Sequence, residues 1–206
     1  MAIHPSAIIE AGVTIGRGTA IWDNVHVRHS THIGDECIIG EKSYIAYGVR
    51  IGDMVKINAF VYICTGVTIE RGVMIAAGTV FTNDRFPRAT TPDLHRLLPS
   101  EPDDHTLTTL VREGATIGAQ ATIGCGLIVG RFAMVGMGSV VTRDVPDFVI
   151  VAGNPARPVG YACSCGQPLL PGIRGLQYEP TEVTCRACGA LYKISGRSVA
   201  QRAKVS

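Results

Sequence analysis

The hydrophobic positions of this chain recur at every sixth residue. The series begins at Ile3 and runs without interruption to Phe81, and most of its members are isoleucine. After a break, the same frame resumes at Val111 and continues to Val141. The second residue of each group of six is often glycine, and the fifth is small or β-branched. A period of six fits neither the 3.6-residue period of a helix nor the alternation of a long straight strand.

Each group of six, or hexad, therefore predicts a short strand followed by a turn, with the first and fifth residues pointing inward. A single hexad has too little apolar surface to fold alone, so the core must come from stacking hexads on one another. The length of the series excludes a chance run of isoleucines. The pattern predicts an all-β, stacked architecture.

Composition excludes several classes of partner. Among 206 residues only 17% are charged, and the formal net charge is +2. Such a weak field does not suggest binding to nucleic acid or to an anionic membrane. No apolar run approaches the roughly 18 residues of a membrane span, and no basic, apolar leader opens the chain. Seven cysteines, an odd number, favour a reducing compartment, so we expect a cytoplasmic protein.

Over residues 3–158 the hexads resemble those of the hexapeptide-repeat acyltransferases, whose pattern is [LIV]-[GAED]-x2-[STAV]-x. The resemblance implies a left-handed parallel β-helix with three hexads in each triangular coil. It also implies a homotrimer with active sites in clefts between subunits. The handedness rests on the resemblance, because the usual crossover between parallel strands is right-handed.

The hexads stop over a loop at about residues 82–109, which is rich in proline and acidic residues. Long loops without structure on a regular scaffold are often functional. The segments Phe81–Ala89 and Thr109–Ala119, on either side, resemble those of bacterial nucleotide-sugar N-acetyltransferases. The pattern is nearest to 3-N-acetyltransferases that act on a UDP-linked 3-amino-hexuronate in surface-polysaccharide synthesis. The resemblance therefore implies an acetyl-CoA-dependent N-acetyltransferase with a nucleotide-sugar substrate.

The residues that open the loop are the candidate active-site residues. We expect Asn83 and Asp84 to orient the amine and hydroxyls of the sugar, and Arg85 or Arg88 to meet a carboxylate or diphosphate through the guanidinium fork. Positioning and exclusion of water supply much of the acceleration. As the resemblance implies, the departing coenzyme A sulfur can take the proton, so no strong protein base is required.

The histidines do not suggest a metal site. Neighbours in the expected coil are eighteen residues apart, so His26, His29 and His32 should not converge on one ion, as a three-imidazole site would require. His95 and His105 lie in the loop, and nothing in the sequence fixes their position.

A third segment, Thr142–Arg157, resembles the V-x-G-N-P-A-[RK] end of acyl-CoA-dependent hexapeptide transferases. The resemblance implies contacts with coenzyme A from the residues Gly153, Ala156, Arg157 and, less strongly, Arg143. A backbone N–H near Gly136 is a candidate to hold the thioester oxygen. The alternative, a turn that only seals the end of the β-helix, is compatible with cofactor binding.

The tail, residues 159–206, differs from the β-helix domain at 1–158. It carries two cysteine pairs, Cys163 with Cys165 and Cys185 with Cys188, each followed by glycine. Four thiolates in two tight turns suit a structural zinc ion, and so short a segment could hardly build its own core. We therefore expect a small C-terminal zinc ribbon, with two disulfides as the alternative.

Two other functions remain open. An O-acetyltransferase, or a transferase with another acyl-CoA donor, should carry a poised histidine as its base. A non-catalytic β-helical scaffold has no reason to keep both the loop segment and the Gly153–Arg157 segment, so it ranks below the two enzymes.

Overall fold

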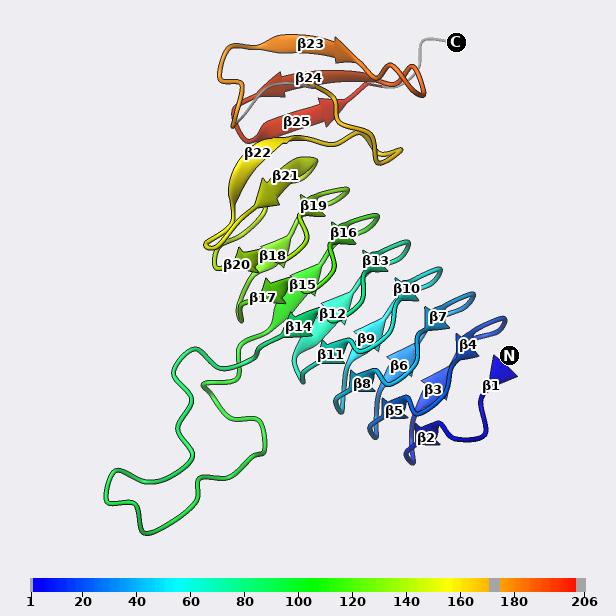
Figure 1. The fold of residues 1–206 in the computed structure, drawn as a ribbon, viewed down its shortest axis with the longest axis vertical. Helices are drawn as coiled ribbons and strands as arrows, with labels where there is room; N and C mark the ends of the chain where they lie inside the picture. The colour runs from blue at the N-terminus through cyan, green and yellow to red at the C-terminus, as the bar shows by residue number, and fades with distance from the viewer. Residues whose placement is uncertain (1, 171–174, 203–206) are drawn as a thin grey trace.

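The protein is an all-β coil of short strands with a separate small sheet at its C-terminal end (Figure 1). The computed structural model describes residues 2–170 and 175–202. Within these residues the expected fold is confirmed: a left-handed parallel β-helix built from hexads, with one loop ejected from it. The chain passes in turn through three parallel sheets, which form the three faces of the coil.

The described strands fall into four sheets. The first sheet runs in the spatial order β1 (Ala2–Ile3), β4 (Ala20–Ile21), β7 (Ile38–Ile39), β10 (Lys56–Ile57), β13 (Met74–Ile75), β16 (Thr116–Ile117), β19 (Met134–Val135), β21 (Val149–Ala152) and β22 (Arg157–Tyr161). The second sheet runs β2 (Ile8–Ile9), β5 (His26–Val27), β8 (Tyr44–Ile45), β11 (Tyr62–Ile63), β14 (Val80–Phe81), β17 (Thr122–Ile123) and β20 (Val140–Val141).

The third sheet runs β18 (Ile128–Val129), β15 (Thr109–Val111), β12 (Val67–Ile69), β9 (Arg50–Ile51), β6 (His32–Ile33) and β3 (Thr14–Ile15). The fourth sheet lies in the tail and holds β23 (Thr181–Thr184), β24 (Leu191–Ser195) and β25 (Ser198–Gln201).

The strand register explains how three hexads make one coil. Ile39 pairs with Ile21 on one side and with Ile57 on the other, eighteen residues away in each direction. Across the loop the partner of Phe81 is Ile123, so the coil closes over the insertion without a change of frame. The loop therefore leaves from the corner between the second and third sheets, after β14, and returns at β15 (Figure 1).

The inward positions form one continuous core. First-position residues from Ile21 to Ile75 are at most 2% exposed. Fifth positions are also buried, and where they carry hydroxyls these groups have partners: Thr31 Oγ1 donates to the Ala46 carbonyl at 2.8 Å, and Thr19 Oγ1 to the Gly34 carbonyl at 2.8 Å. Buried polar groups with partners cost little, so the hexad tolerates threonine inside.

The turns have two different backbone requirements. At the second position the next coil comes very close: a Cβ on Gly40 would lie 2.5 Å from the carbonyl carbon of Asn58. At the fourth position φ is positive, as at Gly48 (φ 69°). Met54 and Phe60 adopt the same conformation with φ of 54° and 59°, although large side chains rarely do so.

The tail packs onto the last coil. β22 pairs antiparallel with β21, and the Phe148 ring meets the Tyr192 ring of β24 edge-on at 5.6 Å between centroids. The first sheet thus continues to Tyr161, past the boundary expected at residue 158. The division into two domains remains a prediction.

In the described residues, no helix is long and apolar enough to cross a membrane.

Candidate functional site

The loop is held at its base by hydrogen bonds to backbone carbonyl groups. Phe81 is buried at 1% exposure and fixes the point of departure. Beyond it, the Thr82 hydroxyl donates to the Ile123 carbonyl at 3.3 Å, and the Leu107 N–H donates to the Asn83 carbonyl at 2.8 Å. The backbone of Asn83 therefore has a structural role, whereas its half-buried side chain makes no hydrogen bond within the described residues.

The loop encloses a cleft of about 530 Å³. Its lining includes three of the predicted site residues, Asp84, Arg85 and Arg88, together with His105 from the returning limb of the loop. Asp84 Oδ1 accepts the Phe86 N–H at 2.8 Å. This hydrogen bond fixes one carboxylate oxygen and leaves the second oxygen available to a ligand. Asn83 is not part of the lining; it lies at the base of the loop. With Asp103 and Asp104 also in the lining, the cleft brings together two arginines, three carboxylates and an imidazole.

A second contact ties the loop to an earlier coil. Tyr47 Oη donates to the Ser100 carbonyl at 3.2 Å, and the His29 ring stacks on the Tyr47 ring at 5.2 Å between centroids. Thr65 Oγ1 donates to the Tyr47 carbonyl at 3.2 Å, one coil further along. His29, Tyr47, Thr65 and the loop thus share the corner between the second and third sheets, as the eighteen-residue spacing predicts.

The three early histidines do not converge, as predicted. His26 Nε2 lies 2.8 Å from Glu10 Oε1, whereas His29 stacks on the Tyr47 ring. His32 pairs in register with Thr14 and Arg50 on the third sheet. These contacts account for each imidazole separately, without a shared ion.

Among the carboxylates at this end of the coil, Glu10 has the most strongly shifted pKa. Its Oε2 accepts the His29 N–H at 2.9 Å, and its Oε1 is paired with Arg28 and His26. The hydrogen bond from His29, with smaller contributions from Arg28 and His26, lowers the pKa of Glu10 from 4.5 to about 2.

The end of the coil brings three predicted cofactor residues together. Arg143, Ala156 and Arg157 line one narrow cleft of about 40 Å³. The turn between β21 and β22 is fixed because the Ala156 N–H donates to the Val140 carbonyl at 2.8 Å. Gly153 has φ of 100°, which explains the glycine there, and its N–H donates to Ser139 Oγ at 3.1 Å.

A backbone donor near Gly136 remains a prediction, but the N–H of Gly136 itself is engaged. It donates to the Val151 carbonyl at 2.8 Å as part of the ladder between coils. The glycine is explained by packing: a Cβ there would lie 3.0 Å from the Cβ of Ala152. Sequence reasoning missed this because glycine at a second position serves the approach of the next coil in every hexad.

A groove that the sequence reasoning missed follows the corner between the first and second sheets. It has a volume of about 460 Å³, and its walls are mostly small third- and fourth-position residues, flanked by the exposed Phe60 and Met137. Within the described residues, the N–H groups of Ala77, Ala119 and Met137 donate no hydrogen bond. Alanine at successive third positions, as at Ala77 and Ala119, is the sequence signal that could have found this groove.

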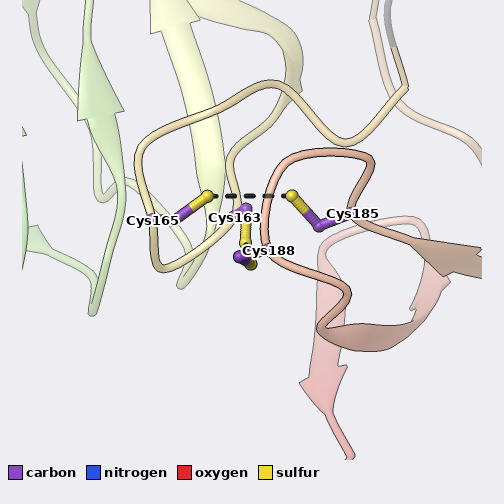
Figure 2. Close-up of side chains that lie close together, drawn as sticks. All are labelled: Cys163, Cys165, Cys185 and Cys188. Carbon is purple, nitrogen blue, oxygen red and sulfur yellow. Dashed lines mark hydrogen bonds between the residues drawn. The ribbon is translucent and has the colours of Figure 1, made fainter.

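The four predicted metal cysteines lie together (Figure 2). Their sulfurs all lie within 4.8 Å of one another, with Cys163 to Cys188 at 3.5 Å and Cys165 to Cys185 at 3.7 Å. Two sulfurs of a regular tetrahedron with metal–sulfur bonds of about 2.3 Å are about 3.8 Å apart. The cluster therefore has the size of a four-thiolate metal site.

Two turns supply the ligands, one after β22 and one between β23 and β24 (Figure 2). The Gly166 N–H donates to the Cys163 carbonyl at 2.8 Å, and the Gly189 N–H donates to the Cys185 carbonyl at 2.9 Å. All seven cysteines are free thiols in the structure, so neither pair forms the disulfide considered as the alternative.

Tyr192, in β24, contacts the cluster formed by the four cysteines. Its hydroxyl lies 3.1 Å from Cys163 Sγ and accepts the Ser164 N–H at 3.0 Å. Burial raises the pKa of the Cys163 thiol, but hydrogen bonds from the Cys165 backbone and from Tyr192 outweigh burial and lower it to about 6. The hydrogen bond with the Gln167 backbone lowers the pKa of Cys165, but its side-chain hydrogen bonds with the other thiols outweigh it and raise that pKa to about 12.

The remaining cysteines belong to the core. Cys37 and Cys64 are buried, and burial raises the pKa of the Cys64 thiol to about 12. Burial also raises the pKa of the Cys37 thiol. A thiol that stays protonated is a poor nucleophile, so both side chains are suited to packing.

Comparison with known families identifies the repeat. The sequence model of the bacterial transferase hexapeptide (six repeats) matches residues 12–47 and 48–83. The hexapeptide repeat of succinyl-transferase matches residues 31–64 and 113–143. These matches show that residues 12–83 and 113–143 of this chain consist of hexapeptide repeats.

Two curated relatives show how far the likeness extends. Over 93 residues the chain is 44% identical to dTDP-3-amino-3,6-dideoxy-alpha-D-galactopyranose 3-N-acetyltransferase from Aneurinibacillus thermoaerophilus, covering 45% of this chain and 44% of that protein. Over 50 residues it is 52% identical to serine acetyltransferase from Escherichia coli strain K12, covering 24% of this chain and 18% of that protein. The chain thus spans less than half the length of either relative.

Among solved structures, WeeI from Acinetobacter baumannii AYE is 28% identical with a TM-score of 0.47, covering 77% of this chain and 57% of that chain.

Proposed function

We propose that this protein is an acetyl-CoA-dependent N-acetyltransferase that acts on the amino group of a nucleotide-linked amino sugar. The observation that carries the proposal is the 44% identity over 93 residues to a 3-N-acetyltransferase of a dTDP-linked 3-amino sugar. The loop segment supports a UDP-3-amino-hexuronate as the substrate. The dTDP-linked sugar of that relative and a UDP-3-amino-hexuronate share an amino group at carbon 3, so the proposed acceptor is a 3-amino group whichever sugar carries it.

The cleft in the loop is the proposed site for the nucleotide sugar. Arg85 and Arg88 line it with Asp84, Asp103 and Asp104, and both arginines are exposed in the loop. A planar guanidinium fork matches the paired oxygens of a diphosphate or a carboxylate. These two arginines therefore hold the charged part of the substrate, and Asp84 is placed to accept a hydrogen bond from a sugar hydroxyl.

The groove along the opposite corner is the proposed path of the acyl-carrying arm of coenzyme A. Small side chains let an extended chain lie close to the backbone, and free N–H groups at Ala77, Ala119 and Met137 can donate to its amide oxygens. Gly136 and Gly153 belong to the same corner, because Gly136 follows β19 and Gly153 follows β21, the next strand of the same sheet. Arg143, Ala156 and Arg157 then meet the phosphate end.

Acetyl transfer then needs positioning more than a strong base. The neutral amine nitrogen attacks the thioester carbonyl carbon, the carbon–sulfur bond breaks, and the departing sulfur takes the proton that the nitrogen loses. Asn83 offers an amide that can both donate and accept without charge, so it orients the amine. With the Gly136 N–H engaged, a free N–H of the alanine-lined corner is the proposed donor to the developing oxyanion.

The two sites lie at different corners of one chain, which supports a trimeric enzyme. The loop leaves from the corner between the second and third sheets, and the groove follows the corner between the first and second sheets. In a homotrimer with threefold symmetry, these two corners of adjacent subunits meet at one interface. We propose that each active site is completed by two subunits.

For the tail we propose a closed zinc site formed by Cys163, Cys165, Cys185 and Cys188. The sulfur spacing supports it, and four protein ligands leave no position for catalysis. We propose residues 159–206 as a zinc-ribbon domain beside the β-helix domain of residues 1–158. Free thiols also suit the reducing cytoplasm in which we place the enzyme.

The second candidate function is O-acetylation, favoured by the 52% identity over 50 residues to a serine acetyltransferase. Such a reaction needs a base to activate a hydroxyl. His105 lines the cleft and is the candidate base in that case, whereas His95 is not in the lining.

The test compares matched pairs of sugars. Release of free thiol from acetyl-CoA is followed with UDP- and dTDP-linked 3-amino sugars and with the corresponding 3-hydroxy sugars. We expect turnover with amino sugars only. Turnover with the hydroxy sugars that is lost in His105→Ala would favour O-acetylation, and no turnover with either set would refute both enzyme functions.

A further inference from the structure

The tail contributes a side chain to the cleft at the end of the coil. Arg197, in the turn between β24 and β25, lines the same cleft as Arg143 and Arg157. The three arginines come from three separate segments: the turn after β20, the start of β22 and the tail. Sequence reasoning placed only the first two near a cofactor, because Arg197 lies forty residues further along the chain in another element.

The turn that carries Arg197 is anchored to the coil. Tyr161, at the end of β22, is 1% exposed, and its hydroxyl donates to the Gly196 carbonyl at 2.7 Å. The same hydroxyl accepts the Gln177 N–H at 2.7 Å, and the Gly196 N–H donates to the Gln177 carbonyl at 2.7 Å. Arg197 therefore follows directly after a buried, fully hydrogen-bonded residue, and its Cα has little freedom.

The four-cysteine cluster contacts the far end of β24, the strand that precedes the Arg197 turn. Tyr192 of β24 contacts Cys163 Sγ with its hydroxyl and Phe148 with its ring. Ile194, two residues further along β24 on the same face, is fully buried. The cluster, β24 and the Arg197 turn form one connected unit packed on the last coil, so loss of the metal should also displace Arg197.

The cleft has the charge and size for a phosphate. Three arginines and one carboxylate, Asp144, line the cleft. Asp144 Oδ1 already accepts the Ile128 N–H at 2.9 Å, and Arg157 donates through Nη1 to the Ala156 carbonyl at 3.0 Å, which leaves its other guanidinium N–H groups for an anion. The free volume of about 40 Å³ holds about three water molecules, which is the room for a phosphate group rather than for a whole nucleotide. Arginine forks bind phosphate oxygens in pairs, and an exposed cluster of them attracts an anion.

We propose that Arg197 binds a phosphate of coenzyme A, so that the metal-bearing tail completes the cofactor site of the β-helix. The inference rests on the proposed acetyl-CoA dependence and adds a role for the tail. It assigns the metal an indirect function: the metal holds the tail fold that places Arg197 beside Arg143 and Arg157.

Calorimetric titration of coenzyme A into the full-length protein tests the proposal. Arg197→Ala should weaken binding by about 5- to 20-fold, the loss of one partly exposed charge-assisted contact. The matched control is Lys193→Ala, which removes a positive charge from the exposed face of β24, the strand that precedes the Arg197 turn, and should leave the dissociation constant unchanged. Both variants change exposed side chains, and equal melting temperatures confirm their folding.

A second titration identifies the phosphate. The same two proteins are then titrated with 3′-dephospho-coenzyme A. If Arg197→Ala binds this ligand as tightly as the wild type does, Arg197 contacts the 3′-phosphate. If the variant loses as much affinity for it as for coenzyme A, Arg197 contacts the diphosphate. If the wild-type protein binds coenzyme A and Arg197→Ala binds it equally well, the role of Arg197 is refuted while the proposed function stands. If the wild-type protein does not bind coenzyme A, the proposed function itself fails.

Discussion

The replacement of Asn83 by alanine separates a chemical role from a structural one. The substitution removes the side-chain amide but keeps the backbone carbonyl, which accepts the Leu107 N–H at 2.8 Å and closes the base of the loop. Because the half-buried amide makes no hydrogen bond within the described residues, its loss should change the free energy of unfolding by less than about 0.5 kcal/mol. Turnover should nevertheless fall by about 10- to 1000-fold, the usual range for one orienting or polarising group.

Asn83→Asp should be worse than Asn83→Ala at neutral pH. A carboxylate at this position would hold the attacking amine as an ammonium ion, which has no lone pair for attack. Affinity for coenzyme A should be unchanged in both variants, because the proposed cofactor contacts around Gly153 and Arg157 lie at the end of the coil.

The assay combines three measurements on one preparation: initial rates of thiol release at saturating substrates, melting temperature and coenzyme A affinity. Thr82→Val is the matched control. It removes a hydroxyl that donates to the Ile123 carbonyl at 3.3 Å, so it should lower the melting temperature and leave turnover per folded enzyme nearly intact. Near-normal turnover of Asn83→Ala would refute the proposed role of Asn83.

Three further predictions concern the tail, the turns and the pH response. Purified protein should hold about one zinc ion per chain, and Cys185→Ser should lose it while the circular dichroism of the β-helix persists, since repeats are stabilised by their neighbours; metal-free protein with an ordered tail would contradict this. Gly40→Ala should destabilise the fold by about 1–3 kcal/mol, because its Cβ would lie 2.5 Å from the Asn58 backbone. Gly48→Asn, at a turn where a Cβ meets nothing within 4 Å, should shift the melting temperature much less; equal shifts would refute the explanation of the second-position glycines. The pKa of Glu10 is lowered to about 2 from 4.5, so its pairing stabilises the fold above pH 4.5 and is lost as the pH falls towards 2. The melting temperatures of wild type and Glu10→Gln should therefore converge across this range, and a constant difference would exclude the pairing.

The coil could be predicted from the sequence because its physics is local and repeated. One large aliphatic residue every sixth position, as from Ile3 to Phe81, determines both the strand period and the inward face. The register across the loop was also predictable, since Phe81 and Val111 belong to the same frame. The grouping of the four cysteines could be predicted from their spacing, because each cysteine pair lies within one turn and two such turns can meet.

The turns were predicted only in part. The second-position glycines mark the close approach of the next coil. The left-handed fourth positions accept Met54 and Phe60, so no residue type identifies them. At these positions the hydrogen bonds of the coil impose the conformation on whichever residue is present.

Contacts between distant segments could not be predicted. The Gly136 N–H follows the regular ladder, but its partner is Val151 because the last coil is irregular and β21 pairs with β19. The contact of Tyr47 with Ser100 and the position of Arg197 depend on how a loop and a tail pack, and no period governs either. Candidate residues could thus be named from the sequence, but their grouping into clefts required the fold.

The most direct test of the proposed function is the fate of an isotopically labelled acetyl group. The protein is incubated with labelled acetyl-CoA and a nucleotide-linked 3-amino sugar, and the product is identified by nuclear magnetic resonance and mass spectrometry. We predict one acetamide at the sugar nitrogen for each thiol released. Thiol release without an acetylated sugar, or an ester on a sugar hydroxyl in place of the amide, would contradict the account.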